Sequence, residues 1–364
     1  MARPLVRAFL CAAAMLGGVV ATSATSATSA TARATSTGTP ARQPFTSVVR
    51  ILPGNEVRPT AISCTAHGLC VAVDYNGRIY ALSGGHSEEL AATGDSLFAI
   101  SCPARTFCMA MSNDFSLELL SKGSRQLSLG GGPDVGDVHW ESVSCPTPQF
   151  CMAGGGVVTG PATGWAAVAR WNGSRWSGPV VTDPPRTQLA TNAIASVSCI
   201  SPSFCVGADD NGETFQWNGF RWSAAAPLDQ PAVGDSFHVS CTSAHFCLAL
   251  GLGTSDAFAW NGRAWTRQPS PDLPWGNGVL SCTTPDFCIG TDDTGNVSAW
   301  NGRDWSTPVT VSDIAGSGIQ AISCAGGACE IVLGAGQFAY LYAGKHPPKL
   351  PVLCDEVRCP RTLT

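Results

Sequence analysis

A pair of cysteines recurs seven times in this chain of 364 residues and limits its possible folds more than any other feature. Six copies read Ser-Cys, five residues and Cys, and the seventh is one residue shorter. The copies begin 38 to 54 residues apart, and a period of about forty residues is typical of repeat architectures. The seven pairs are Cys64 and Cys70, Cys102 and Cys108, Cys145 and Cys151, Cys199 and Cys205, Cys241 and Cys247, Cys282 and Cys288, and Cys324 and Cys329.

Each repeat contains the turn signals that four short strands need. In the fourth unit, Asp210-Asn211-Gly212 and Asn218-Gly219 separate β-prone runs, and the cysteine pair brackets a further hairpin. Asn-Gly between alternating apolar residues favours a two-residue turn, which would pair Trp217 with Phe220. One four-stranded unit per period predicts an all-β fold, a seven-bladed β-propeller over residues 44–344 with four-stranded blades and one disulfide inside each blade.

The loop lengths predict how the strands of a blade, named a to d from the axis outward, follow one another. Strand a should end at the first cysteine, b should begin at the second, c should end at the Trp-Asn-Gly and d should carry the last Trp. The b–c turns and the d–a crossovers then share one face, and the cysteine loops and Trp-Asn-Gly turns share the other. The seventh unit lacks an outer strand after residues 338–342. We therefore expect the β-prone run at residues 45–50 to supply strand d and remove a free edge.

The spacing of the cysteines favours disulfides over a metal site. Sixteen of the 17 cysteines form eight close pairs, the eighth being Cys354 and Cys359, and only Cys11 is left over. Complete short-range pairing is typical of disulfides in an oxidising compartment. Zinc ligands are the alternative, but they are usually separated by two to four residues, whereas five separate the cysteines here.

The N-terminus has the pattern of a secretory signal. Arg3 and Arg7 precede an apolar run at residues 8–21 that is too short to span a bilayer, and small residues follow. We predict a signal peptide at residues 1–23, a disordered Ala/Thr/Ser tether at 24–43 and a C-terminal tail at 345–364. The mature protein is expected to be a secreted monomer, extracellular or bound to the cell wall, without a membrane span.

Composition and motifs argue against several functions and do not identify an activity. Charged residues make up 13% of the chain, the net charge is −5 and no basic cluster is present, which argues against nucleic acid as a partner. There is no Gly-x-Ser-x-Gly elbow, His-Glu-x-x-His motif or Walker loop, and no cofactor is expected. Asp209, Asn211 and Glu213 alternate like the oxygen ligands of a calcium loop but lack its terminal bidentate Glu, so a turn is favoured over a metal.

A Trp-Asn-Gly-x-x-Trp unit is complete in four repeats. The tryptophans could stack on sugar rings or fill the wedge between blades, and their recurrence with the cysteines favours the core. Arg263 and Arg303 could lie across the rings of their own repeats. The pairs are Trp171 and Trp176, Trp217 and Trp222, Trp260 and Trp265, and Trp300 and Trp305.

Two resemblances follow from these motifs. Asp210-Asn211-Gly212-Glu213-Thr214-Phe215 resembles the Asp-box of sialidase-like propellers, which implies a structural turn rather than a catalytic role. The Cys-x5-Cys and Trp-Asn-Gly repeat over residues 60–344 is similar to uncharacterised secreted propellers of actinobacteria. That similarity implies the fold and export without an activity.

One departure from the repeat locates a candidate site. The third unit is eight residues longer than the fourth between Cys151 and Trp171, and insertions mark a face that is free to vary. Trp140, Trp165 and Trp275 lie outside the repeated Trp unit and near that face, so they are the candidate ligand contacts. These features favour a non-catalytic binding protein at the cell surface or wall, with a glycan or protein ligand. The alternatives are a propeller glycoside hydrolase or lyase, and a structural envelope protein.

Overall fold

The computed structural model describes residues 48–342, except 52–56, 67, 84–85, 113–114, 121–122, 130–136, 161–162, 184–191, 229–235, 255, 274–275, 277, 311–317, 327 and 335–336. The described part is built from β-strands in four-stranded antiparallel sheets. The first three sheets hold β2(Pro59–Cys64), β3(Cys70–Asp74), β4(Arg78–Ser83) and β5(His86–Ala92); β6(Ala99–Ala104), β7(Phe107–Met111), β8(Phe115–Leu120) and β9(Gly123–Ser128); and β10(Asp137–Thr147), β11(Phe150–Gly160), β12(Thr163–Trp171) and β13(Val180–Asp183). The next three hold β14(Ile194–Ser201), β15(Phe204–Asp209), β16(Glu213–Trp217) and β17(Ala226–Pro227); β18(Phe237–Ser243), β19(Phe246–Gly251), β20(Ala257–Trp260) and β21(Trp265–Gln268); and β22(Leu280–Thr284), β23(Phe287–Thr291), β24(Asn296–Trp300) and β25(Val309–Thr310). The last sheet holds β26(Ile319–Ala325), β27(Ala328–Leu333), β28(Gln337–Tyr342) and β1(Val48–Ile51).

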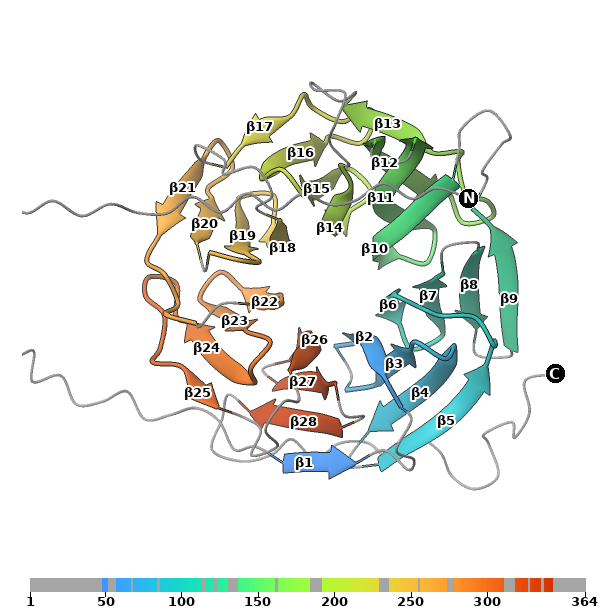
Figure 1. Ribbon diagram of the computed structural model, residues 1–364, viewed down its shortest axis with the longest axis horizontal. Helices are drawn as coiled ribbons and strands as arrows, with labels where there is room; N and C mark the ends of the chain where they lie inside the picture. Colours follow the sequence, from blue (N-terminus) through green and yellow to red (C-terminus); the bar gives the residue numbers. More distant parts are fainter. Residues whose placement is uncertain are drawn as a thin grey trace, which may run out of the picture. The chain divides into compact units, whose positions relative to one another are not determined.

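The sheets stand around an axis as the blades of a β-propeller (Figure 1). The first strand of each sheet is innermost and contacts the innermost strands of both neighbours, and β26 contacts β2 to complete the circle. Hydrophobic clusters fill the spaces between consecutive sheets, as where Met109 and Met111 of β7 pack against Trp140 and Trp171 of the next sheet. The core is therefore a ring of inter-blade layers.

The structure corrects the predicted count of seven blades where blades formed from consecutive strands are concerned. Six blades, not seven, are complete within a continuous segment of four consecutive strands, from β2–β5 to β22–β25. In the described part of the chain no fourth strand follows β26, β27 and β28, and these strands form a sheet with β1 from the other end of the chain. The expected closing segment is confirmed, because β1 runs antiparallel to β28 from Val48↔Tyr340 to Ile51↔Gln337.

Disulfides join the cysteine pairs within their own repeats, as the spacing predicts. Each bond bridges strands a and b across the first hairpin; Cys199, for example, lies directly opposite Cys205 in the ladder, with Cα atoms 4.0 Å apart. A link that closes so short a loop contributes about 2 kcal/mol in the loop-entropy account. Among the described residues the bonds join Cys64 to Cys70, Cys102 to Cys108, Cys145 to Cys151, Cys199 to Cys205, Cys241 to Cys247, Cys282 to Cys288, and Cys324 to Cys329.

The other predicted cysteine pair is not tested by the structure. Cys354 and Cys359 lie outside the described residues, as does Cys11. A disulfide between Cys354 and Cys359 therefore stays a prediction from their spacing.

The serine before each first cysteine joins neighbouring blades. Its Oγ accepts a hydrogen bond from the backbone N–H of the first cysteine in the next blade, at 2.9–3.0 Å, as from Cys102 to Ser63. The same bond recurs around the ring and ends with Cys64 donating to Ser323. The Ser-Cys dipeptide therefore holds the innermost strands together through the serine and fixes each hairpin through the cysteine.

The tryptophan pairs belong to the scaffold, but in a different register from the one expected. Trp217 pairs with Trp222, not with Phe220, which is 91% exposed at the loop tip. Asn218 closes a four-residue loop, since its Oδ1 accepts the N–H groups of Phe220 and Arg221. The first Trp of each pair donates its indole N–H to a carbonyl of the cysteine loop, for example Trp217 to Pro202 at 3.0 Å.

The predicted signal peptide, tether and C-terminal tail fall outside the described residues. No helix in the described part of the chain is long and apolar enough to cross a membrane.

Candidate functional site

The acidic residues of the b–c turns have structural roles. Asp74, Asp209 and Asp292 are buried at the end of strand b, and one carboxylate oxygen of each accepts the N–H groups two and four residues ahead. This arrangement fixes the turn and occupies the oxygens that a cation would need. Among the described residues, no group of three or more His, Cys, Asp or Glu could hold a metal ion.

Bulges in the innermost strands affect a second set of residues, which includes acidic and polar ones. In four blades one residue is skipped in the a–b pairing, between Pro59/Ala61, Trp140/Ser142, Ile194/Ser196 and Ile319/Ala321. A bulge redirects the side chain of the extra residue out of the ladder. The skipped residues include Glu141 and Gln320, which are exposed although they lie on innermost strands. Solvent therefore reaches the axis at the end of the ring that carries the b–c turns.

We call this end of the axis the axial rim and define it by Tyr75, Phe98, Glu141, Asp210 and Gln320. Tyr75 and Asp210 occupy the same position in the b–c turns of two blades, directly after the buried aspartate. Asp293 occupies it in a third blade and is exposed. Because these turns are part of the rigid scaffold, the side chains that they present are held in place.

One carboxyl group of the axial rim has a perturbed pKa. Burial raises the pKa of Glu141 to about 7, and the charge of Asp210 adds to the effect. Glu141 is itself exposed, so nearby protein atoms, rather than full enclosure, cause this shift. Asp210 is fixed by Ser236, whose hydroxyl donates to Oδ1 at 2.7 Å from the crossover into the next blade. The pair thus combines an acid that is partly protonated at neutral pH with a neighbouring carboxylate.

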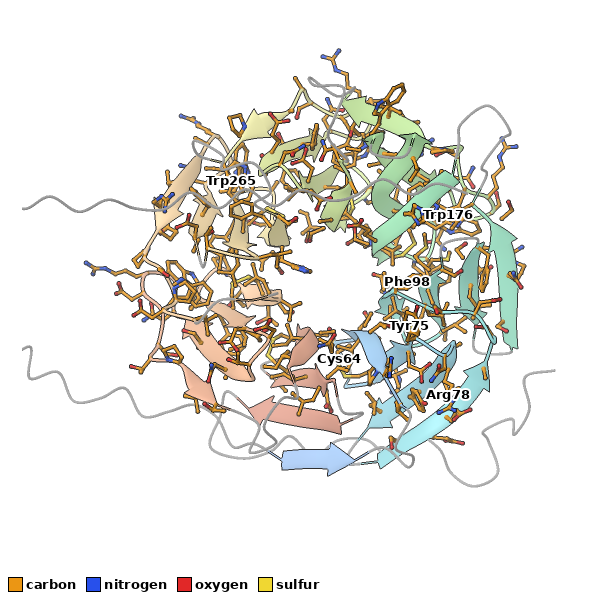
Figure 2. All side chains as sticks on the ribbon, viewed as in Figure 1. Cys64, Tyr75, Arg78, Phe98, Trp176 and Trp265 are labelled. Atoms are coloured by element: carbon orange, nitrogen blue, oxygen red, sulfur yellow. A yellow bond between two sulfur atoms is a disulfide. The ribbon has the colours of Figure 1, made fainter. Side chains whose placement is uncertain are left out.

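An aromatic pair forms another part of the axial rim. Tyr75 is 53% exposed, and its ring meets that of Phe98 edge-on with centroids 6.2 Å apart. Figure 2 shows both residues beside the axis, between the first two blades. The hydroxyl of Ser96 donates to the Tyr75 carbonyl at 2.7 Å and ties the turn to the following crossover. An exposed aromatic side chain on a fixed turn offers a large contact area at low entropic cost.

His238 lies on β18, the innermost strand of the fifth blade. Its counterparts in the other repeats are small or aliphatic, including Ala61, Ala99 and Ser196. Burial lowers the pKa of His238 to about 4, so the imidazole is neutral at physiological pH. It can therefore offer a hydrogen-bond donor and an acceptor without charge.

The three tryptophans chosen from the sequence do not come together. Trp140 is only 3% exposed and packs in the core between the second and third blades, so it has no ring face free for a ligand. Trp165 is half-buried on β12, opposite Val157 in the extension of the b–c hairpin. Trp275 lies outside the described residues. Of the three, only Trp165 can be carried forward as a candidate contact.

The third-blade insertion forms a well-packed hairpin. Strands β11 and β12 pair from Cys151↔Trp171 to Gly160↔Thr163. A Cβ added to Gly155 would collide with the carbonyl oxygen of His139, which explains a glycine there. Asn192 in the next crossover donates its backbone N–H to the Gly164 carbonyl and its amide to Asp209. The insertion is therefore fixed to the neighbouring blade, on the same face as the axial rim.

The sequence analysis did not select Glu141, although an alignment of the repeats shows that a charged residue is unusual at its position. When the seven repeats are aligned on their Ser-Cys, Glu141 is the one charged residue at its position. Trp140, one position earlier, is aligned with the buried Leu97, Ile194 and Ile319. The alignment thus identifies Glu141 as unusual at its position and Trp140 as a core residue. The position of Glu141 lies three residues before the serine of each Ser-Cys, and in the seven repeats it holds Thr60, Phe98, Glu141, Ala195, Phe237, Gly278 and Gln320.

The sheet order, the ring of innermost strands and the axial rim place this chain in the class of β-propellers. No protein-family model and no curated protein matches the sequence. Solved propellers match its fold. YCF48 bound to D1 peptide is 14% identical with a TM-score of 0.59, covering 83% of this chain and 98% of that one. Catalytically inactive virginiamycin B lyase from Staphylococcus aureus with quinupristin is 10% identical with a TM-score of 0.66, covering 82% and 99%. The WD40 propeller domain of Doa1 is 10% identical with a TM-score of 0.60, covering 81% and 96%.

Replacing Glu141 with glutamine should change how stability depends on pH. The folded-state pKa is raised from 4.5 to about 7, so between these values the folded protein binds more protons than the unfolded chain. Wild-type stability should therefore fall as pH rises through this window, and Glu141→Gln should lack that part of the fall. Because solvent screens the carboxylate, the variant should gain no more than about 1 kcal/mol at pH 8 and nothing at pH 4. Thermal unfolding at both pH values measures the gain, and an equal difference at the two would contradict the assignment.

Proposed function

We propose that this protein is an exported, non-catalytic binding propeller that holds a protein segment at its axial rim, at the cell surface or wall. The observation that carries the proposal is the axial rim itself, where the exposed Tyr75, in contact with Phe98, and the interacting carboxylates of Glu141 and Asp210 lie at one end of the axis. Such a surface suits a peptide with an apolar or aromatic side chain beside a basic one. YCF48, which shares the fold, has been solved with a bound peptide.

Export is supported by the seven disulfides, which persist in an oxidising compartment, together with the signal-like N-terminus of the sequence. Trp165 is a second proposed contact, because the extended hairpin of blade 3 carries it on the face of the axial rim. A glycan ligand is the competing outcome at this surface, since an exposed aromatic ring can also stack on a sugar.

Tyr75→Ala should weaken binding of the ligand about tenfold or more, because the side chain would lose a large desolvated contact area. The ligand is sought by probing arrays of synthetic peptides and of glycans with the purified protein, and the affinity of the best peptide hit is then measured for each variant. Phe220→Ala is the matched control, since that aromatic residue is also exposed but lies on the opposite face. Trp165→Ala should weaken binding less than Tyr75→Ala.

Equal affinities of Tyr75→Ala and Phe220→Ala for the best hit would overturn the axial rim as the binding surface. Glycan hits without peptide hits would overturn the choice of a protein ligand.

A glycoside hydrolase or lyase is the second candidate, and Glu141 is the observation that favours it. A carboxylic acid with a pKa near 7 beside a second carboxylate is the usual arrangement of a general acid and its partner. The two candidates differ in what happens to a bound probe. Incubation followed by mass spectrometry should recover an array hit unchanged from a binding protein. Cleavage that falls at least a hundredfold in Glu141→Gln would establish the enzyme instead.

A further inference from the structure

A cavity lies between the fourth and fifth blades, away from the axis. Its volume is about 170 Å³, and it is lined on one side by Thr214, Gln216 and Ser223 and on the other by Trp260, Arg263 and Trp265. Figure 2 shows Trp265 at the outer part of the ring, beside β21. A cavity of about 150 Å³ can hold a benzene ring, so this one has room for a single six-membered ring.

One of the side chains that line the cavity is smaller than its counterpart in the preceding blade. At the preceding interface, Arg170 of blade 3 covers Trp217 of blade 4, with its guanidinium carbon 6.0 Å from the ring centre. Gln216 is the equivalent residue of blade 4, since both residues precede the first Trp and donate their N–H to the serine of the outer segment. Trp260, which lines the cavity with Gln216, is half-buried, whereas Trp217, which Arg170 covers, is buried.

The groups around the cavity combine two indole rings with polar side chains at the edge. Trp260 and Trp265 lie 5.8 Å apart at an angle of 51°. Ser223 Oγ accepts from the Gln216 backbone and donates to the Ala224 carbonyl, which leaves a lone pair toward the cavity. Within the described part of the chain, no side-chain hydrogen bond or ion pair holds the Gln216 amide or the Arg263 guanidinium. The predicted stacking of Arg263 on the Trp rings of its own repeat is not found there either.

We propose that this cavity, the indole pocket, binds one pyranose ring of an acidic glycan, with a carboxylated sugar such as a hexuronate as its preferred unit. A pyranose has apolar C–H faces that suit the indole rings and a polar edge that suits Gln216 and Ser223. Arg263 adds the charge that a carboxylate complements, in the paired geometry that guanidinium groups favour. An aromatic side chain would fill the same volume but leave these polar groups without partners. The indole pocket is independent of the axial rim, which lies on another part of the molecule.

The test measures binding of methyl glucuronide and methyl glucoside to the intact mature protein by ligand-detected NMR. The glucuronide should bind the wild type more tightly than the glucoside. Gln216→Arg should abolish binding of both, because it restores the side chain that fills this space between blades 3 and 4. Arg263→Gln should lower affinity for the glucuronide about tenfold and leave the glucoside unchanged.

Arg303→Gln is the matched control, because Arg303 occupies the same loop position in blade 6 and is 92% exposed away from the indole pocket. It should bind both sugars like the wild type, and each variant is checked for an unchanged melting temperature. Failure of both sugars to bind, retained binding in Gln216→Arg or an equal loss in Arg303→Gln would overturn the proposal. Displacement of the glucuronide by N-acetyltryptophanamide with higher affinity would also overturn it, by identifying an aromatic side chain as the occupant.

Discussion

Trp171→Ala should lower the free energy of unfolding by about 3–5 kcal/mol, the usual cost of removing a fully buried aromatic side chain. Trp171 is 0% exposed, packs against Trp176 at a centroid distance of 5.8 Å and donates its indole N–H to the Pro148 carbonyl at 3.1 Å. The substitution therefore leaves both a cavity between blades and an unpaired carbonyl in the cysteine loop. Denaturant unfolding with the disulfides intact measures the loss.

Phe220→Ala is the control for this experiment, since it removes an aromatic ring of similar size that is 91% exposed. It should change stability by less than about 0.5 kcal/mol. If both variants unfolded at the same denaturant concentration, the repeated tryptophans would not form the core that their burial indicates.

The tryptophans also show how far the sequence could predict this fold. Their regular recurrence correctly indicated core residues, because a side chain repeated with the scaffold cysteines must occupy equivalent positions between blades. The predicted partner of Trp217 was wrong, because Asn-Gly occurs in two-residue turns and in longer loops alike. The loop length is set here by Asn218, whose Oδ1 accepts two backbone N–H groups that follow it. Composition does not reveal this hydrogen bonding.

The link between blades was also out of reach of reasoning about a single repeat. The serine of Ser-Cys was visible in every unit, but its hydrogen-bond partner lies 39 or more residues away, in the next blade. The candidate site had the same difficulty. Glu141 lies at a β-bulge of β10, and Asp210 lies in a turn of the next blade, so their interaction depends on how blades 3 and 4 pack together. Trp140 was misjudged because it was compared with the repeated Trp unit instead of with the apolar residues aligned with it in strand a.

Ring closure leads to the second large effect. Deleting residues 44–51 removes β1, the outer strand of the composite sheet, and should lower the melting temperature by about 8 °C. β1 pairs with β28 over four residues, and ladder hydrogen bonds contribute about 1 kcal/mol each, which corresponds to roughly 2 °C per kcal/mol in a domain of this size. The deletion also exposes β28 as a free edge, so the variant should aggregate more readily than the wild type. Differential scanning calorimetry and light scattering measure the two effects.

The matched control deletes residues 32–39, a segment of equal length in the Ala/Thr/Ser region that precedes β1. Both variants lose eight residues, but only the first loses a strand of the sheet, so the control should melt like the wild type. If the two deletions melted together, β1 would add no stability to the composite sheet. A selective loss in the first variant would show that this sheet depends on a strand from the far end of the chain, since in the described residues its own repeat contributes β26, β27 and β28.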